Sequence, residues 1–165
     1  SSDLMQGHFP SRGLVQNVGD GKMQVLLDEK KKRITENIQN AKSAVDEIKQ
    51  KTDEIDDHFK RLSDMRSASQ AKIDRWFAEF DRIWNGLIDF EPFRSLYSLL
   101  VQREYNYVQR YWQDLRTRPD SFEKMMDLGK TIAPLVGAVK RVTPYMQESF
   151  DQLIHNLVDK REASV

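Results

Sequence analysis

The chain has 165 residues, and its 26 Lys and Arg balance its 26 Asp and Glu, so its formal net charge is zero. Hydrophobic residues make up 39% and charged residues 32%, which shifts the balance from the globular average of about 45–50% and 25% toward polar surface. A general nucleic-acid binder would carry a basic excess, so we expect no nucleic-acid partner. The absence of cysteine excludes a disulfide framework, a thiolate metal site and a cysteine nucleophile.

Residues 1–26 form a turn-rich leader that contains four of the seven glycines and Pro10. Gly19-Asp20-Gly21 lies between two short runs of alternating residues, which is a hairpin signal. We therefore expect a leader of turns, with a small hairpin as one option. An isolated two-stranded hairpin is marginally stable in water, so it would need support from another part of the molecule.

Residues 27–88 carry a continuous heptad pattern, which predicts one long coiled-coil helix. With Lys31 at position a, fourteen of the eighteen a and d positions are apolar. A period of 3.5 residues that is sustained this long favours a left-handed supercoil with a partner helix. The predicted oligomerisation seam consists of Ile34, Ile38, Val45, Ile48, Ile55, Phe59, Leu62, Ile73, Trp76, Phe80, Ile83 and Leu87.

Three polar residues interrupt the seam, and we expect them to set its register: Thr52, Arg66 and Ser69. Beyond Ile73 the apolar face widens to include Phe77 and Trp84, as is typical of a helix inside a bundle. The segment from Arg66 to Ser69 is therefore the expected weak point, where a narrow coil gives way to a bundle.

Residues 92–160 predict two to three shorter helices that fold back and pack on the long helix. Pro92 suits the first turn of a helix that runs to about residue 116, and Asp120 or Ser121 caps the next one. We expect a kink or break near Pro134 and Gly137, and a last helix that opens at Thr143-Pro144. Residues 161–165 are a tail.

The chain offers no convincing catalytic or metal-binding constellation, so we expect no enzyme, no cofactor and no metal site. Asp151, His155 and Asp159 lie at four-residue spacing on one helix face, but such a row is usually solvated. His58 follows Glu54 by four residues and reads as a surface pair. Arginines interleave with aromatics between residues 92 and 118, where core packing explains them better than nucleic-acid stacking.

The run of Ile48, Ile55, Phe59 and Leu62, continuing to Trp76, Phe80 and Ile83, resembles the long first helix of the coiled-coil region of tripartite-motif (TRIM) proteins. The resemblance covers residues 27–160, and the later helices would take the place of that family's fold-back segment. It implies an antiparallel homodimer in which the short helices pack near the middle of the long one. Such a dimer is a platform that holds flanking domains apart.

These observations predict an all-α fold, with a long coiled-coil helix followed by shorter helices that fold back into a helical bundle. The predicted function is a non-catalytic self-association or scaffolding module, an elongated homodimer that presents partner-binding surfaces or flanking domains. The alternative is a membrane- or lipid-associating amphipathic bundle, with residues 132–142 and 144–158 as the segments in contact with lipid. The first residues lack the pattern of a signal peptide, from which we expect an intracellular, cytoplasmic protein.

Overall fold

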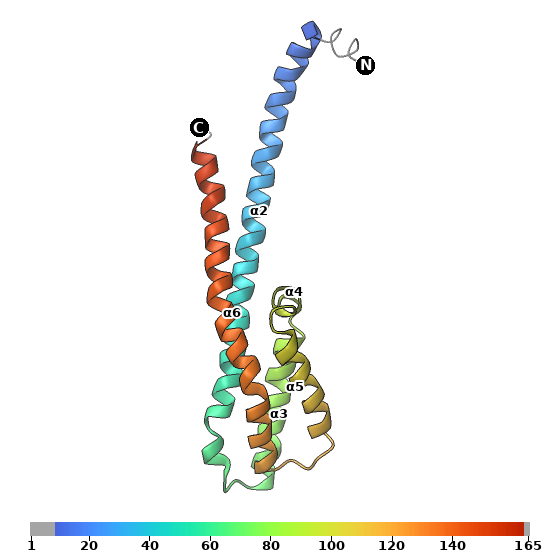
Figure 1. Ribbon diagram of the computed structural model, residues 1–165, viewed down its shortest axis with the longest axis vertical. Coiled ribbons are helices and arrows are strands. Elements are labelled where there is room, and N and C mark those ends of the chain that lie inside the picture. Colours follow the sequence, from blue (N-terminus) through green and yellow to red (C-terminus); the bar gives the residue numbers. More distant parts are fainter. Residues whose placement is uncertain (1–8, 164–165) are drawn as a thin grey trace. The chain divides into compact units, whose positions relative to one another are not determined.

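The computed structural model describes the backbone of residues 9–163 and the side chains of residues 19–158. All regular structure in this part of the chain is helical, which confirms the all-α prediction. Figure 1 shows the elements, which are α2 (Phe9–Lys60), the 3₁₀ helix η1 (Leu62–Met65), α3 (Gln70–Ile88), α4 (Glu91–Tyr97), α5 (Gln102–Leu115) and α6 (Phe122–Ala163).

The chain divides into two units, and both long helices contribute to each. Unit 1 consists of Ser1–Gln39 and Leu153–Val165, so its described part is one stretch of α2 and one of α6. Unit 2 consists of Asn40–Gln152 and holds every other helix.

The leader is helical from Phe9 onward, so the hairpin expected around Gly19-Asp20-Gly21 is wrong. Residues 1–8 lie outside the described residues. Pro10 falls at the start of α2, where its missing N–H would be unpaired in any case. Each interior glycine weakens a helix by only about 1 kcal/mol relative to alanine, and the long helix that follows offsets this cost.

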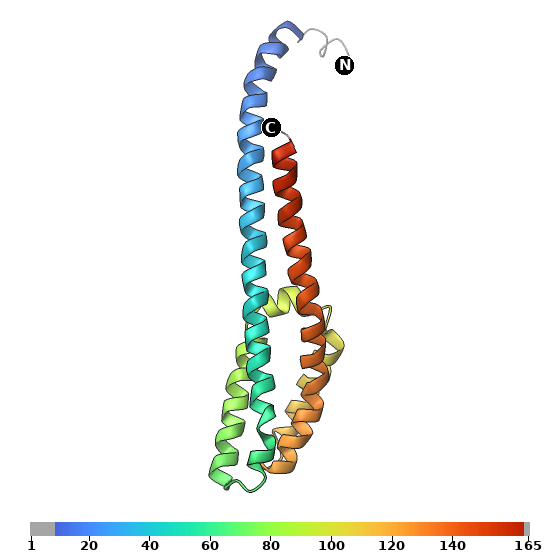
Figure 2. The same ribbon diagram turned by 90° about the vertical axis from the view of Figure 1, so that its left-hand side faces the viewer.

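The single helix predicted over residues 27–88 is also wrong, because α2 ends at Lys60 and α3 begins at Gln70. The interruption includes the expected weak point, but the chain turns there instead of continuing as a coil (Figure 2). Ser69 caps α3, since its hydroxyl oxygen accepts a hydrogen bond from the Lys72 N–H at 3.3 Å. Arg66 is an exposed residue of the turn, with its guanidinium 5.8 Å from the ring centre of Phe122.

In unit 2, α3 runs back along α2, and aromatic side chains fill the space between them. Phe59 of α2 meets Trp76 and Phe80 of α3 edge-on, at ring-centre distances of 5.1 and 5.6 Å. Trp112 of α5 contacts Phe80 edge-on and stacks on Phe77. The widened apolar face of α3 therefore packs inside a bundle formed by this chain.

The helix expected over 92–116 is divided into α4 and α5, and Val101 between them is fully buried. The break expected near Pro134 and the new helix expected at Pro144 are both wrong, because α6 passes through both prolines. Each proline leaves one backbone carbonyl of the preceding turn without a partner. Both prolines lie on an exposed face of α6, where water can hydrate those carbonyls.

Within unit 2, α6 packs closely against α2. A Cβ atom built on Gly129 would lie 3.3 Å from Cδ1 of Phe59, so the missing side chain leaves room for this ring. Lys140 forms an ion pair with Asp56 at 2.6 Å, and Gln147 donates a hydrogen bond to Asp46 at 2.9 Å. Lys42 pairs with Asp151, a hydrogen bond that raises the pKa of the lysine.

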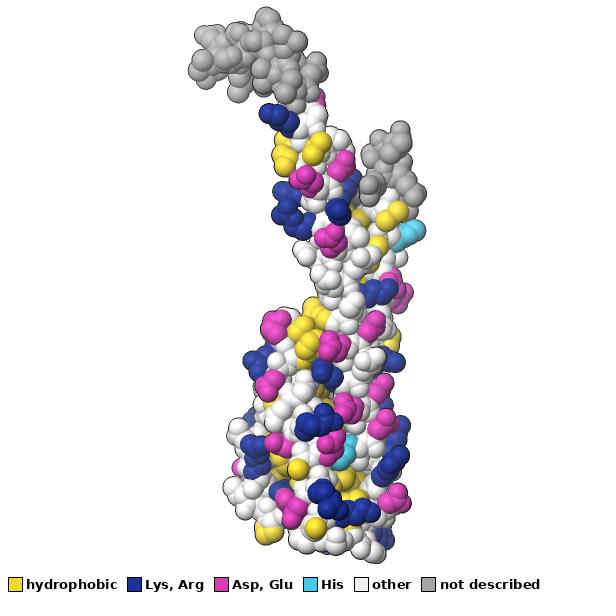
Figure 3. Space-filling view, turned by 180° about the vertical axis from the view of Figure 1, so that it is seen from behind, with side chains coloured by type: hydrophobic (Ala, Val, Ile, Leu, Met, Phe, Trp, Pro, Cys, Tyr) yellow, Lys and Arg dark blue, Asp and Glu magenta, His cyan; other side chains and the backbone are white. Residues whose placement is uncertain are grey.

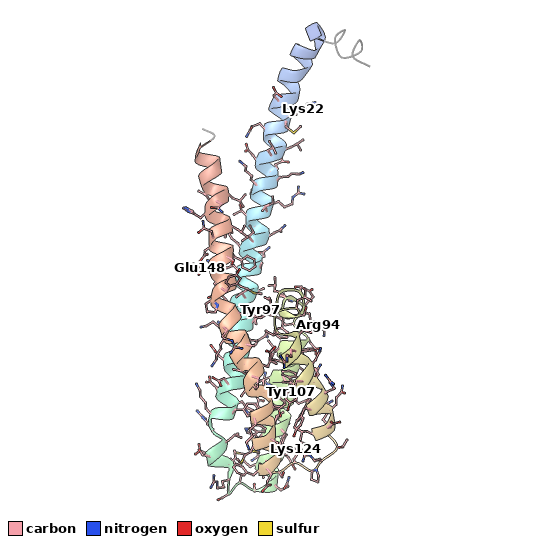
Figure 4. The ribbon with its side chains drawn as sticks, in the orientation of Figure 1. Lys22, Arg94, Tyr97, Tyr107, Lys124 and Glu148 are labelled. Atoms are coloured by element: carbon pink, nitrogen blue, oxygen red, sulfur yellow. The ribbon has the colours of Figure 1, made fainter. Side chains whose placement is uncertain are left out.

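Two buried polar side chains of unit 2, Tyr97 and Lys124, have polar partners, and Figure 4 labels both. Tyr97 of α4 hydrogen-bonds Thr143 of α6 through its hydroxyl at 2.7 Å, and burial raises the pKa of this tyrosine. Lys124 near the start of α6 bonds Asp120 at 2.8 Å and lies 4.7 Å from the ring centre of Phe77. Ser121 caps α6, since its hydroxyl oxygen accepts the Lys124 N–H at 3.1 Å, as the sequence predicted.

Candidate interaction surface

Most residues of the predicted oligomerisation seam lie in the core of unit 2. Val45, Ile48 and Ile55 on α2 are buried within one chain. The same is true of the seam residues on α3, which are Ile73, Trp76, Phe80, Ile83 and Leu87, and Phe59 and Leu62 are half-buried against this core. These side chains are covered within one chain, and the oligomerisation role predicted for them stays a prediction.

The polar residues predicted to set the register have other roles. Thr52 is buried, and its hydroxyl donates a hydrogen bond to the Ile48 carbonyl at 2.8 Å, which satisfies it inside the core. Arg66 lies in the turn and Ser69 caps α3. The register-setting role predicted for these three residues stays a prediction.

The part of the predicted seam that belongs to unit 1 is not fully buried. Ile34 is 45% exposed and Ile38 is half-buried. Seven of the twelve large hydrophobic side chains exposed in the described part of the chain belong to unit 1, which are Met23, Val25, Leu26, Leu27, Ile34, Leu153 and Val158. Figure 3 shows hydrophobic side chains of both helices among charged ones on one face of this unit.

Four of these residues share one side of α2 and form what we call the apolar stripe: Met23, Leu26, Leu27 and Ile34. Their spacing of three, four and seven residues places them within about 100° on a helix of 3.6 residues per turn. Val25 is 57% exposed but lies on the opposite side of the helix. Exposed apolar side chains that gather on one side of a helix are typical of an interaction site.

The segment of α6 in unit 1 lies beside α2 (Figures 1 and 2), and the side chains of the apolar stripe stay about half exposed. In unit 1 the partly covered side chains of α2 are Lys31, Thr35 and Ile38, which recur at steps of four and three residues. That row lies next to the stripe, and Leu27 and Ile34 remain 45% exposed. The two helix segments of unit 1 therefore leave the side chains at heptad position d of α2 partly exposed to solvent.

A row of alternating charges borders the stripe. Lys22, Glu29, Arg33 and Glu36 are all exposed and lie along one edge of it, and Figure 4 labels the first of them. None of the four forms an ion pair with another described side chain. The order of their signs is positive, negative, positive, negative.

A second feature is a groove of about 740 Å³ in unit 2, between the end of α2 and α3. His58 and Trp76 lie in its wall and join the two helices: the His58 Nε2–H donates to the Trp76 carbonyl at 2.9 Å, and the Trp76 indole N–H donates to the His58 carbonyl at 3.3 Å. Their rings stack at 4.3 Å, and burial lowers the pKa of His58. Glu54 and Glu79 at the rim are both engaged by Arg82, at 2.8 Å for the first, which holds the pKa of Glu79 below its usual range.

No sequence pattern predicted this pairing of His58 with Trp76, because the two residues meet only once the helix breaks between them. Reading His58 as one member of a surface pair with Glu54 was therefore wrong. In the described residues no group of three or more His, Cys, Asp or Glu is placed to hold a metal ion. None of the described helices is both long enough and apolar enough to cross a membrane.

Comparisons with known proteins give no relative from which to transfer a function: no family model, no curated protein and no solved structure matches this chain. The tripartite-motif resemblance therefore stays a prediction. The function has to be argued from the surfaces of the molecule itself.

Proposed function

We propose that this protein is a non-catalytic self-association module, and that two copies associate through the apolar stripe of unit 1. The observation that carries the proposal is the contrast in exposure along α2. Ile48 and Ile55 are buried, whereas Leu27 and Ile34, in the same heptad row, are each 45% exposed. Burying a fully exposed side chain of this size contributes about 1.5–3 kcal/mol, so covering the exposed 45% of Leu27 or Ile34 with a partner would contribute about half of that.

The charges beside the stripe favour a second copy as the partner. If two α2 helices run in opposite directions about a centre near residue 30, Lys22 of one copy comes within two residues of Glu36 of the other, and Glu29 within two residues of Arg33. In a parallel pair each of these residues would face its own like charge. Facing opposite charges favour association and select the orientation, whereas facing like charges oppose it. This row of four charges is thus complementary to its own reverse.

The membrane alternative named residues 132–142 and 144–158 as the segments in contact with lipid. Ile132, Leu135, Val136 and Val139 are buried in the core of unit 2, so the first segment has no apolar face free for a bilayer. A surface-bound helix must offer its apolar side to the headgroup boundary. Self-association is therefore the better-supported function.

The test is the molar mass in solution, measured by light scattering after size exclusion between about 5 and 200 μM protein. We expect a dimer, and we expect Leu27→Glu to shift it toward monomer, because a carboxylate in an apolar interface is costly to desolvate. The matched control is Val25→Glu, which adds the same charge at a somewhat more exposed position on the other side of α2. A wild-type protein that is monomeric at 200 μM would overturn the proposal, and so would equal effects of the two variants.

A further inference from the structure

The exposed apolar surface of unit 1 is not confined to α2. Leu153 of α6 is 48% exposed, and Leu157 one turn later is half-buried. The first belongs to a heptad row with Ile132, Val139 and Met146, all three buried in unit 2. The second belongs to a row that includes the buried side chains of Val136 and Thr143.

On both α2 and α6, the heptad rows that are buried in the core of unit 2 continue into unit 1, where their side chains are partly exposed. In unit 2 those rows belong to one hydrophobic cluster with side chains of α3, α4 and α5. Unit 1 contains only the two helix segments. Two helices bury only the line along which they touch, and a bundle core needs further helices across the open face.

We propose that the open face of both helices is covered by the same face of a second copy, so that the interface between copies is a four-helix bundle made of two α2 and two α6 segments. This inference rests on the proposed self-association and specifies its partner surface. It differs from a two-stranded coil, in which α2 pairs with α2 alone and α6 contributes nothing. Leu27 and Ile34 of α2 and Leu153 and Leu157 of α6 are the side chains that the second copy would bury.

Charged residues within the apolar surface of α2 favour an interface of four helices over a two-stranded coil. The stripe on α2 is interrupted at Lys30, and the heptad position a at Lys31 is also charged. A lysine in the seam weakens a two-stranded coil and shortens its effective length. Leucines from α6 on both copies would supply the apolar contacts that this short stripe lacks.

The experiment measures the dimer dissociation constant of four full-length proteins by sedimentation equilibrium: wild type, Leu27→Glu, Leu153→Glu and Val158→Glu. The four-helix interface predicts that Leu153→Glu weakens dimerisation at least tenfold, as Leu27→Glu does. Val158→Glu is the matched control, since Val158 is 43% exposed and lies about 140° around α6 from Leu153. It should change the dissociation constant less than threefold.

The outcomes separate this inference from the proposed function. If Leu27→Glu dissociates the dimer but Leu153→Glu does not, the copies associate through α2 alone and the four-helix interface is wrong. A monomeric wild type overturns both. Because a glutamate could also fray α6, Leu153→Ala is measured beside it: helicity by circular dichroism should be unchanged, and dimerisation should weaken by a smaller factor than with glutamate.

Crosslinking gives an independent readout, because the natural chain contains no cysteine. Single-cysteine proteins Gln24→Cys and Asn156→Cys, distinguishable by mass, are mixed and treated with a bismaleimide. A four-helix interface yields the mixed product that joins α2 of one copy to α6 of the other. An interface of α2 alone yields products of the first variant with itself and none that contain the second, which would overturn the inference.

Discussion

Unit 2 and unit 1 are built from the same two long helices, yet they bury their apolar rows to different degrees. In unit 2, α3 supplies Trp76, Phe77, Phe80 and Trp84, and the rows of α2 and α6 are covered. In unit 1 the same rows contain Leu27, Ile34 and Leu153, which are about half exposed. The comparison indicates that a heptad pattern fixes which side of a helix is apolar. How far that side is buried depends on how many further helices of the chain pack against it.

The largest expected effect removes the aromatic cover of unit 2. Phe80 is fully buried, stacks on Trp84 and meets Phe59 and Trp112 edge-on. Phe80→Ala should therefore lower the free energy of unfolding by about 3–5 kcal/mol, a large share of the 5–15 kcal/mol typical of a domain. Urea denaturation followed by circular dichroism measures this loss. Tyr107→Ala, at an exposed ring, is the control, and similar midpoints for both variants would contradict the packing described here.

Gly129 and Gly86 differ in the space that surrounds them, which an alanine at each position would test. At Gly129 the added methyl of alanine would lie 3.3 Å from Cδ1 of Phe59, so this ring must shift by a few tenths of an ångström, which offsets the gain in helix propensity. At Gly86 of α3 nothing lies within 4 Å of the added methyl, so Gly86→Ala should stabilise by about 0.5–1 kcal/mol. We therefore expect Gly129→Ala to have a lower melting temperature than Gly86→Ala. If the two variants gain the same melting temperature over the wild type, α6 does not pack on Phe59 as closely as the structure shows.

The heptad pattern located the apolar side of α2 and α3 correctly, but could not show that the chain folds back. Arg66 and Ser69 marked the weak point, and a polar pair in a seam is compatible with either a weakened coil or a turn. The decisive contact is the cap that Ser69 makes with Lys72, together with rings that pair residues 59 and 80 across the turn. Such pairings depend on tertiary packing, which local periodicity does not contain.

The prolines of α6 teach a related lesson. Pro134 and Pro144 predicted breaks because each removes a helix hydrogen bond, yet the neighbouring Ile132, Leu135 and Val139 are buried in the core. Packing along α6 outweighs the local cost of about 3 kcal/mol for each proline. A sequence reading that weighs only the proline will end this helix too early.

Amide hydrogen exchange sharpens the comparison between the two units. If a second copy covers unit 1, amides of residues 23–38 should exchange more slowly as protein concentration rises, because exchange proceeds through the monomer. For a dimer the monomer fraction falls with the square root of concentration, so a tenfold increase should slow exchange about threefold. Amides of α3 in unit 2 serve as the internal control and should not respond. Concentration-independent exchange in both units would show that unit 1 is not covered by a partner copy.

The smallest expected effect concerns the hydrogen-bonded and stacked pair of His58 and Trp76. Burial lowers the pKa of His58 in the folded protein, so the unfolded chain binds the proton more tightly than the folded one. The stability from the neutral ring is therefore fully present above the unfolded pKa of about 6.5, and it is lost as the pH falls from there toward the lower folded value.

Melting temperatures between pH 7.5 and 5.5 should fall for the wild type and fall less for His58→Gln. The loss belongs to His58 because the Glu79 carboxylate, whose pKa is lowered by its hydrogen bond to Arg82, remains ionised throughout this range. Glu79 has the same sign of dependence, but its contribution is lost only as the pH falls below about 4.5. Equal slopes for the two proteins would mean that burial of the His58 ring does not disfavour its protonated form. The stack at 4.3 Å could then hold the charged ring as well as the neutral one, since an imidazolium over an indole face is itself attractive.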